Sequence, residues 1–249
     1  MKPKKYTTSI KQQLKELINS FKNKKIIWVL CYDILFILIA GIILKTSAML
    51  MTGQLEKAGL TKPSALTPEI LSQQIGTLKS LAIIFFIITI IAYIILIIDY
   101  TLFRGWAWTK IFNKKPTKAY IKKFLLLNLI WITGWIILFV LLLNIINPQY
   151  YFYLIITVVI LYTHLTTVMH YSYTKTNKIK TSINKAFATG IGKLNKFIIP
   201  YLFIIIFYII FTGIITLIPK QSQAMAIFSI IILFMAWYKT YMNQIIKQT

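Results

Sequence analysis

The chain has 249 residues, of which 58% are hydrophobic and 13% charged, and its formal net charge is +23. Soluble domains are about 45–50% apolar and about 25% charged. This composition excludes a soluble single-domain enzyme, a disordered chain and a disulfide scaffold. With Cys31 as its single cysteine, the chain can form no intrachain disulfide.

Six apolar segments are each long enough to cross a bilayer, whose hydrocarbon core of about 30 Å needs roughly 20 helical residues. They cover about 26–44, 81–103, 124–146, 150–169, 197–218 and 222–241. The turns at 147–149 and 219–221 are too short to cross a membrane, so each joins two spans into a hairpin. We predict an all-α integral membrane bundle of six helices over residues 26–246, built as three hairpins. In the last span, Lys239 is expected to extend its amine toward the membrane surface.

The basic residues gather on one side of this topology. Of the 28 lysines and arginines, 23 lie in residues 1–25, in segments 104–123 and 170–196, or in the tail from Lys239. The other five lie in the turn 219–221 or in the long loop 45–80. By the positive-inside rule, we expect a multi-pass protein of the cell membrane with both termini cytoplasmic and loop 45–80 extracytoplasmic.

The long loop contains two helix signals. Residues 48–58 indicate a short amphipathic helix closed by Gly59, and Thr67-Pro68-Glu69 indicates the start of another helix that runs into the second span.

Two segments that precede spans repeat one amphipathic pattern, whose apolar residues fall at offsets 0, 4, 8 and 11. They are Ile10, Leu14, Ile18 and Phe21 in segment 8–25, and Ile183, Phe187, Ile191 and Leu194 in segment 181–196. These offsets form one stripe of a helix. A shorter unit, 116–124, precedes the third span. We expect basic amphipathic helices in the cytoplasmic headgroup layer, with lysines toward anionic lipid headgroups.

A topology anchor explains these basic helices without any further function. The alternative is a docking face for lipid, for the ribosome or for another protein partner. Nucleic acid is not an expected partner, because no recognition motif accompanies the basic segments.

The few polar side chains inside the spans are functional candidates by default. In the predicted orientation they lie in the cytoplasmic half of the membrane, where they could form one polar cluster. The candidates are Asp33, Asp99, Asn128, His164 and Arg104.

A structural interpretation competes with the functional one at each of these positions. Asp99 is close enough to the interface to pair with Arg104 or a lysine, and His170 is expected at the interface. Asp33 is the deepest charge, about 10 Å into its span. Its nearest candidate partner by depth is His164, and for these two residues both interpretations stay open.

Known catalytic and metal-binding motifs are missing from the sequence. Asp99 is not part of a Gly-x-Gly-Asp motif, and residues 189–194 lack the first glycine and the final hydroxyl of a phosphate loop. His164 and His170 are six residues apart, on roughly opposite faces of a helix, which makes them a poor metal pair. We therefore expect no catalytic residues, no cofactor and no metal.

Two stretches resemble known membrane proteins. Residues 183–187 and 196–202 are similar to the repeat unit of several uncharacterised prokaryotic six-span families, including the membrane domain fused to some glycerophosphodiester phosphodiesterases. Asp99-Tyr100, residues 103–108, Lys122-Lys123-Phe124 and Asn128 resemble uncharacterised archaeal six-span proteins. The resemblance implies a six-helix fold in a prokaryotic, archaeal membrane. It carries over no activity, because no phosphodiesterase domain is attached.

These observations favour a non-enzymatic multi-pass membrane protein that binds lipid or a partner. The alternative is a transporter or channel for a small, anionic solute, and an intramembrane enzyme is the third candidate. A continuous polar cavity reaching past Asp33 would favour transport, whereas a filled core with Asp33 paired locally would favour binding.

The predicted topology can be tested with reporter fusions. Fusions after Lys115 and after Lys180 should report a cytoplasmic location, and a fusion near Gly59 should report an external one, because basic loops are retained inside. An external location for the Lys115 fusion would overturn the six-span topology.

Overall fold

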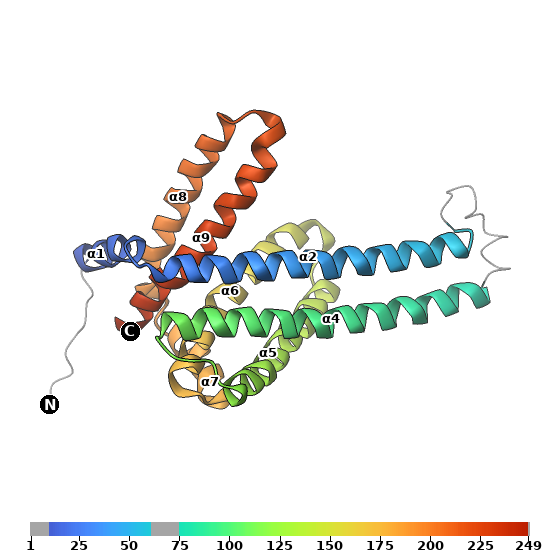
Figure 1. The fold of residues 1–249 in the computed structure, drawn as a ribbon, viewed down its shortest axis with the longest axis horizontal. Helices are drawn as coiled ribbons and strands as arrows, with labels where there is room; N and C mark the ends of the chain where they lie inside the picture. The colour runs from blue at the N-terminus through green and yellow to red at the C-terminus, as the bar shows by residue number, and fades with distance from the viewer. Residues whose placement is uncertain (1–9, 61–74, 249) are drawn as a thin grey trace. The chain divides into compact units, whose positions relative to one another are not determined.

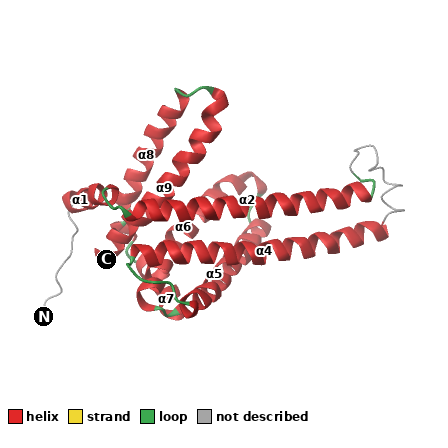
Figure 2. Ribbon diagram, viewed as in Figure 1, coloured by secondary structure: helices red, strands yellow, loops and turns green. Residues whose placement is uncertain are grey.

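The computed structural model describes residues 10–60 and 75–248, and within these ranges it contains eight α-helices and no strand (Figures 1 and 2). Six of these helices are long and apolar enough to cross a membrane. The six are α2 (Lys25–Lys57), α4 (Ile75–Ile111), α5 (Lys118–Ile145), α6 (Tyr151–Thr176), α8 (Ile198–Thr216) and α9 (Lys220–Gln248). The predicted all-α, six-helix membrane class is therefore confirmed.

Two shorter helices precede spans, as the repeated amphipathic pattern predicts. Helix α1 (Ile10–Phe21) precedes α2, and α7 (Ile179–Gly190) is followed by the short 3-10 helix η3 (Leu194–Lys196) and then by α8. The predicted middle unit is the start of α5 itself, where the Thr117 side chain accepts a hydrogen bond from the Tyr120 backbone N–H. A second 3-10 helix, η2 (Pro148–Tyr150), joins α5 to α6.

The first hairpin is longer than its apolar segments. Residues 45–57, expected in a loop, continue α2 without a break, so the amphipathic pattern at 48–58 is the end of the span and not a separate helix. Gly59 ends the helix with a φ of +71°. Its N–H donates to the Glu56 carbonyl and the Leu60 N–H donates to the Leu55 carbonyl, which is the Schellman arrangement. The signal at Thr67-Pro68-Glu69 lies outside the described residues.

The chain divides into two compact units. Unit 2 is Leu35–Phe103, and unit 1 comprises Met1–Ile34 and Arg104–Thr249. In unit 2, α2 and α4 run side by side (Figure 1), and the rings of Phe36 and Tyr100 meet edge to face at 5.7 Å.

Unit 1 holds two clusters of buried apolar side chains. One cluster joins α1, α8 and α9 to the start of α2 and the end of α4, around Trp108, Phe197 and Trp237. The other joins α5, α6 and α7, around Phe124 and Met169. Away from these clusters the apolar helices are exposed: Ile145 is 78% exposed and Leu217 84%. Such continuous apolar surface is typical of helices that face lipid.

Candidate functional site

The carboxylate of Asp33 is held by two cations inside unit 1. Arg104 donates from Nη1 to Asp33 Oδ1 at 2.5 Å, and Lys239 donates from Nζ to Oδ1 and Oδ2, also at 2.5 Å. The side chains of Asp33, Arg104 and Lys239 are 2%, 7% and 9% exposed. We call these three residues the ion cluster; it joins the first turns of α2, the end of α4, and α9.

Burial makes this pairing necessary. A carboxylate or ammonium moved out of water loses several kcal/mol of hydration, which only close opposite charges and hydrogen bonds can offset. Arg104 is the only arginine among the 28 basic residues of the chain. Its guanidinium is more weakly hydrated than an ammonium and presents a rigid fork of donors, so it suits a buried carboxylate better than lysine does.

The ion cluster is not neutral, because one carboxylate faces two cations. The three side chains therefore carry a formal surplus of one positive charge. This surplus is the feature of the cluster most relevant to an anionic ligand, although the low exposure of Arg104 and Lys239 leaves little of either side chain accessible.

His164 has partners other than the expected Asp33. Its Nε2 lies 2.9 Å from the Gly190 carbonyl oxygen, and the Tyr201 hydroxyl lies 2.6 Å from its Nδ1. A carbonyl can only accept, so Nε2 carries a proton and donates, while Nδ1 accepts from Tyr201. The pairing of Asp33 with His164, which the sequence left open, is not present in the structure, because depth in the membrane does not determine which way a helix face points.

The glycine at position 190 leaves room for α7 to approach His164. A Cβ atom on Gly190 would lie 2.5 Å from Leu165 Cδ2 and 3.4 Å from His164 Nε2. Gly190 thus lets the end of α7 contact α6 closely enough for its carbonyl to accept the imidazole proton.

Asn128 belongs to a separate polar pair. Its Oδ1 accepts a hydrogen bond of 2.8 Å from Nε2 of His170. The His170 ring lies edge-on to Phe124, with ring centroids 4.7 Å apart, and only 2% of the residue is exposed. His170, expected at the interface, is therefore buried between α5 and α6.

Asp99 lies on α4, in unit 2. It is 6% exposed, and its Oδ2 has no hydrogen-bond partner among the described residues. Arg104, one of the partners expected for Asp99, is hydrogen-bonded to Asp33. Among the candidate residues of unit 1, Asp33 and Arg104 pair directly, whereas His164 bonds to Gly190 and Tyr201, and Asn128 bonds to His170.

Sequence reasoning missed Lys239 and Tyr201. Lys239 was assigned to the membrane surface because a lysine in a weak apolar span can extend outward. A buried position for Lys239 was indicated by Asp33 and Arg104. These two opposite charges lie inside apolar helices, where they need charged partners from other helices. Tyr201 carried no signal, since tyrosine is common throughout the chain.

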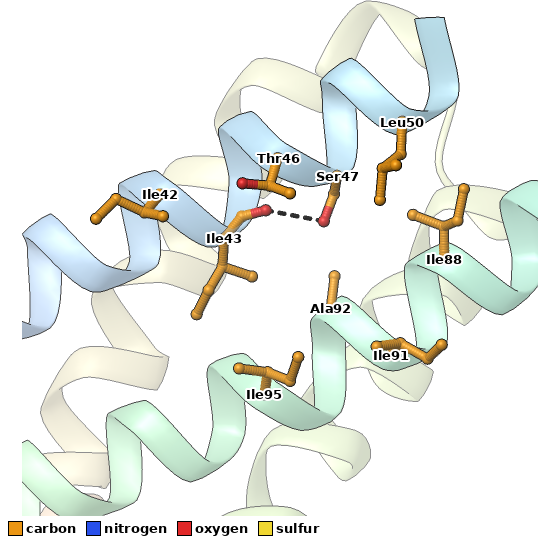
Figure 3. A pocket seen from close by; sticks show the side chains of 9 residues that line it. All are labelled: Ile42, Ile43, Thr46, Ser47, Leu50, Ile88, Ile91, Ala92 and Ile95. Carbon is orange, nitrogen blue, oxygen red and sulfur yellow. Dashed lines mark hydrogen bonds between the residues drawn. The ribbon is translucent and has the colours of Figure 1, made fainter. Parts of the chain in front are cut away.

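A pocket in unit 2 is lined mainly by apolar side chains of α2 and α4 (Figure 3). Its volume is about 260 Å³, and its polar lining residues are Thr46 and Ser47. The Ser47 hydroxyl donates to the Ile43 carbonyl at 2.8 Å, as the dashed line in Figure 3 shows. The pocket presents no ionisable side chain, so it offers no acid, base or metal ligand for chemistry. Among the described residues, no group of three or more His, Cys, Asp or Glu side chains is placed to hold a metal ion.

Comparisons with protein-family models, with curated proteins and with solved structures find no match for this chain. The class of protein therefore follows from the fold alone: it is a multi-pass, all-α membrane protein. The resemblance to six-span prokaryotic families stays an expectation.

The ion cluster predicts that replacing Asp33 destabilises the protein much more than replacing Asp99 does. Asp33→Asn should lower the free energy of unfolding by about 3–5 kcal/mol, because it leaves two buried cations without their counter-charge. Adding Lys239→Met should recover part of this loss, because it removes one stranded cation. Asp99→Asn is the matched control and should cost little, because the Oδ2 of Asp99 has no hydrogen bond to lose.

Unfolding of these variants in detergent micelles, combined as a double-mutant cycle, measures the coupling. Equal losses from Asp33→Asn and Asp99→Asn, or strictly additive effects of the Asp33 and Lys239 changes, would contradict the ion cluster.

Proposed function

We propose that this chain is a non-enzymatic multi-pass protein of the cell membrane that acts by binding lipid. The observation that carries the proposal is the local pairing of Asp33, the deepest charged side chain of the predicted spans. Charged residues inside a membrane are functional candidates by default. Here the carboxylate is 2% exposed and holds three helices together, which is a structural role.

The other polar side chains of unit 1 support the same interpretation. Trp131 donates to the Thr166 hydroxyl at 2.8 Å, and Tyr173 donates to the Tyr120 carbonyl at 3.0 Å. Each bond joins two helices and satisfies a buried polar group, as a stable core requires. Side chains that are already hydrogen-bonded between helices have few free donors or acceptors for a substrate.

The exposed surface favours lipid as the ligand. About half of the apolar side chains of α5 and α8 are exposed, and Pro200 is the one buried residue of α8. The lysine bias supports cytoplasmic termini, and with them basic segments that face the anionic side of the membrane.

The second candidate is a transporter of a small anionic solute, favoured by the surplus positive charge of the ion cluster. An anion that approached Arg104 and Lys239 would neutralise this surplus. Transport would require these side chains to become accessible during a conformational change.

Proteoliposomes and native mass spectrometry distinguish the two functions. We expect purified protein to retain phospholipid through detergent exchange, and liposomes containing it to take up chloride or phosphate no faster than empty liposomes. Protein-dependent anion uptake that Lys239→Met abolishes would overturn the proposal in favour of transport. Complete loss of phospholipid on detergent exchange would overturn it as well.

A further inference from the structure

Helices α1 and α7 each expose three residues of their apolar stripe, whereas Ile183 in α7 packs against the cluster around Phe124 and Met169. In α1, Leu14, Ile18 and Phe21 are 40%, 55% and 54% exposed. In α7 and the turn after it, Phe187, Ile191 and Leu194 are 45%, 57% and 50% exposed. A helix on the surface of a soluble protein turns its apolar stripe toward the core, so both helices are arranged the opposite way.

The faces that do pack against unit 1 come one residue earlier in each helix. These inward residues are Gln13, Leu17 and Ser20 in α1, and Ser182, Ala186 and Gly190 in α7. Each directly precedes a member of the apolar stripe, with the same offset in both helices. The two helices therefore share a sequence pattern and also turn corresponding residues toward the core.

Specific contacts fix this orientation. In α1, the Ser20 hydroxyl accepts from Trp237 Nε1 at 2.8 Å and donates to the Leu17 carbonyl at 2.6 Å. In α7, the Gly190 carbonyl accepts from His164. Phe21 also stacks on Trp237 at 5.2 Å while half of its side chain stays exposed. The stripes thus stay exposed because the neighbouring face, about 100° around the helix, is the one that packs.

The lysines next to the apolar stripes indicate which kind of surface covers the stripes. Lys15, Lys22 and Lys24 are exposed around α1, and Lys180 and Lys185 are exposed on α7. Each helix comes shortly before a membrane span, α2 or α8. An apolar stripe flanked by lysines fits the boundary between acyl chains and anionic headgroups.

We infer that α1 and α7 are two equivalent membrane-surface helices that insert their apolar stripes at the acyl boundary and bind anionic phospholipid headgroups through their lysines. This inference rests on the proposed function, because it names the lipid class and the site. The pattern holds at five stripe positions: the preceding residue faces the protein, the stripe residue faces the acyl chains, and the following residue faces water. These positions are Leu14, Ile18, Phe21, Phe187 and Ile191.

The depth of labelled side chains tests this arrangement in the full chain. In a Cys31→Ser background, spin labels at Ile18→Cys and Ile191→Cys should be relaxed by oxygen, which concentrates in the acyl region. Labels at the matched positions Asn19→Cys and Asn184→Cys should be relaxed by a water-soluble nickel complex. The measurement is made in nanodiscs of phosphatidylcholine with phosphatidylglycerol.

The lysines are tested by lipid selectivity. Replacing Lys15, Lys22, Lys24, Lys180 and Lys185 by Gln should weaken retention of phosphatidylglycerol relative to phosphatidylcholine, by about fivefold per lysine at low salt. The control replaces Lys45, Lys57 and Lys79 by Gln and should leave the selectivity unchanged.

Two outcomes would overturn the inference. Stripe labels that neither reagent reaches would indicate a protein partner, and unchanged selectivity in the five-lysine variant would exclude these helices as the headgroup site. Both results are compatible with lipid bound elsewhere, whereas a protein that retains no phospholipid at all would contradict the proposed function itself.

Discussion

The structure of unit 1 depends on satisfying one buried carboxylate. Asp33 is separated from Lys239 by 206 positions in the sequence, yet its two oxygens bind that lysine and Arg104. An ion out of water must be paired, so the first turns of α2, the end of α4 and α9 have to meet with these three faces inward. The aromatic side chains of Trp108, Phe197 and Trp237 then fill the surrounding core.

This constraint explains why the polar residues and the apolar surface are distributed as they are. Several buried polar side chains pair between helices near the core, as His170 does with Asn128. The rest of each span keeps an exposed apolar surface, which is stable only in hydrocarbon. In α1 and α7, the faces that contain Ser20, Ser182 and Gly190 pack inward, while most of each apolar stripe stays exposed.

The class of fold could be predicted from the sequence because the bilayer imposes a minimum length on every apolar helix. Helix ends were also readable where a residue has a local role, as Gly59 does. Which polar side chains pair with each other could not be predicted. Hydropathy gives the depth of a residue in the membrane, whereas the rotation of its helix is set by packing. Depth alone therefore made His164 the nearest candidate partner of Asp33 and placed Lys239 at the surface. The single arginine, Arg104, was a candidate from the sequence, but its pairing with Asp33 could not be predicted from depth.

The ion cluster can be measured directly by solid-state NMR of the protein in bilayers. The chain has only two aspartates, Asp33 and Asp99, so ¹³C-labelled aspartate gives two carboxyl signals that Asp99→Asn reduces to one. With ¹⁵N-labelled lysine, the Asp33 carboxyl carbon should show a strong dipolar coupling to a lysine Nζ, and Lys239→Met should remove it. A coupling that is absent from the wild-type protein, or that survives Lys239→Met, would contradict the structure on which this account rests.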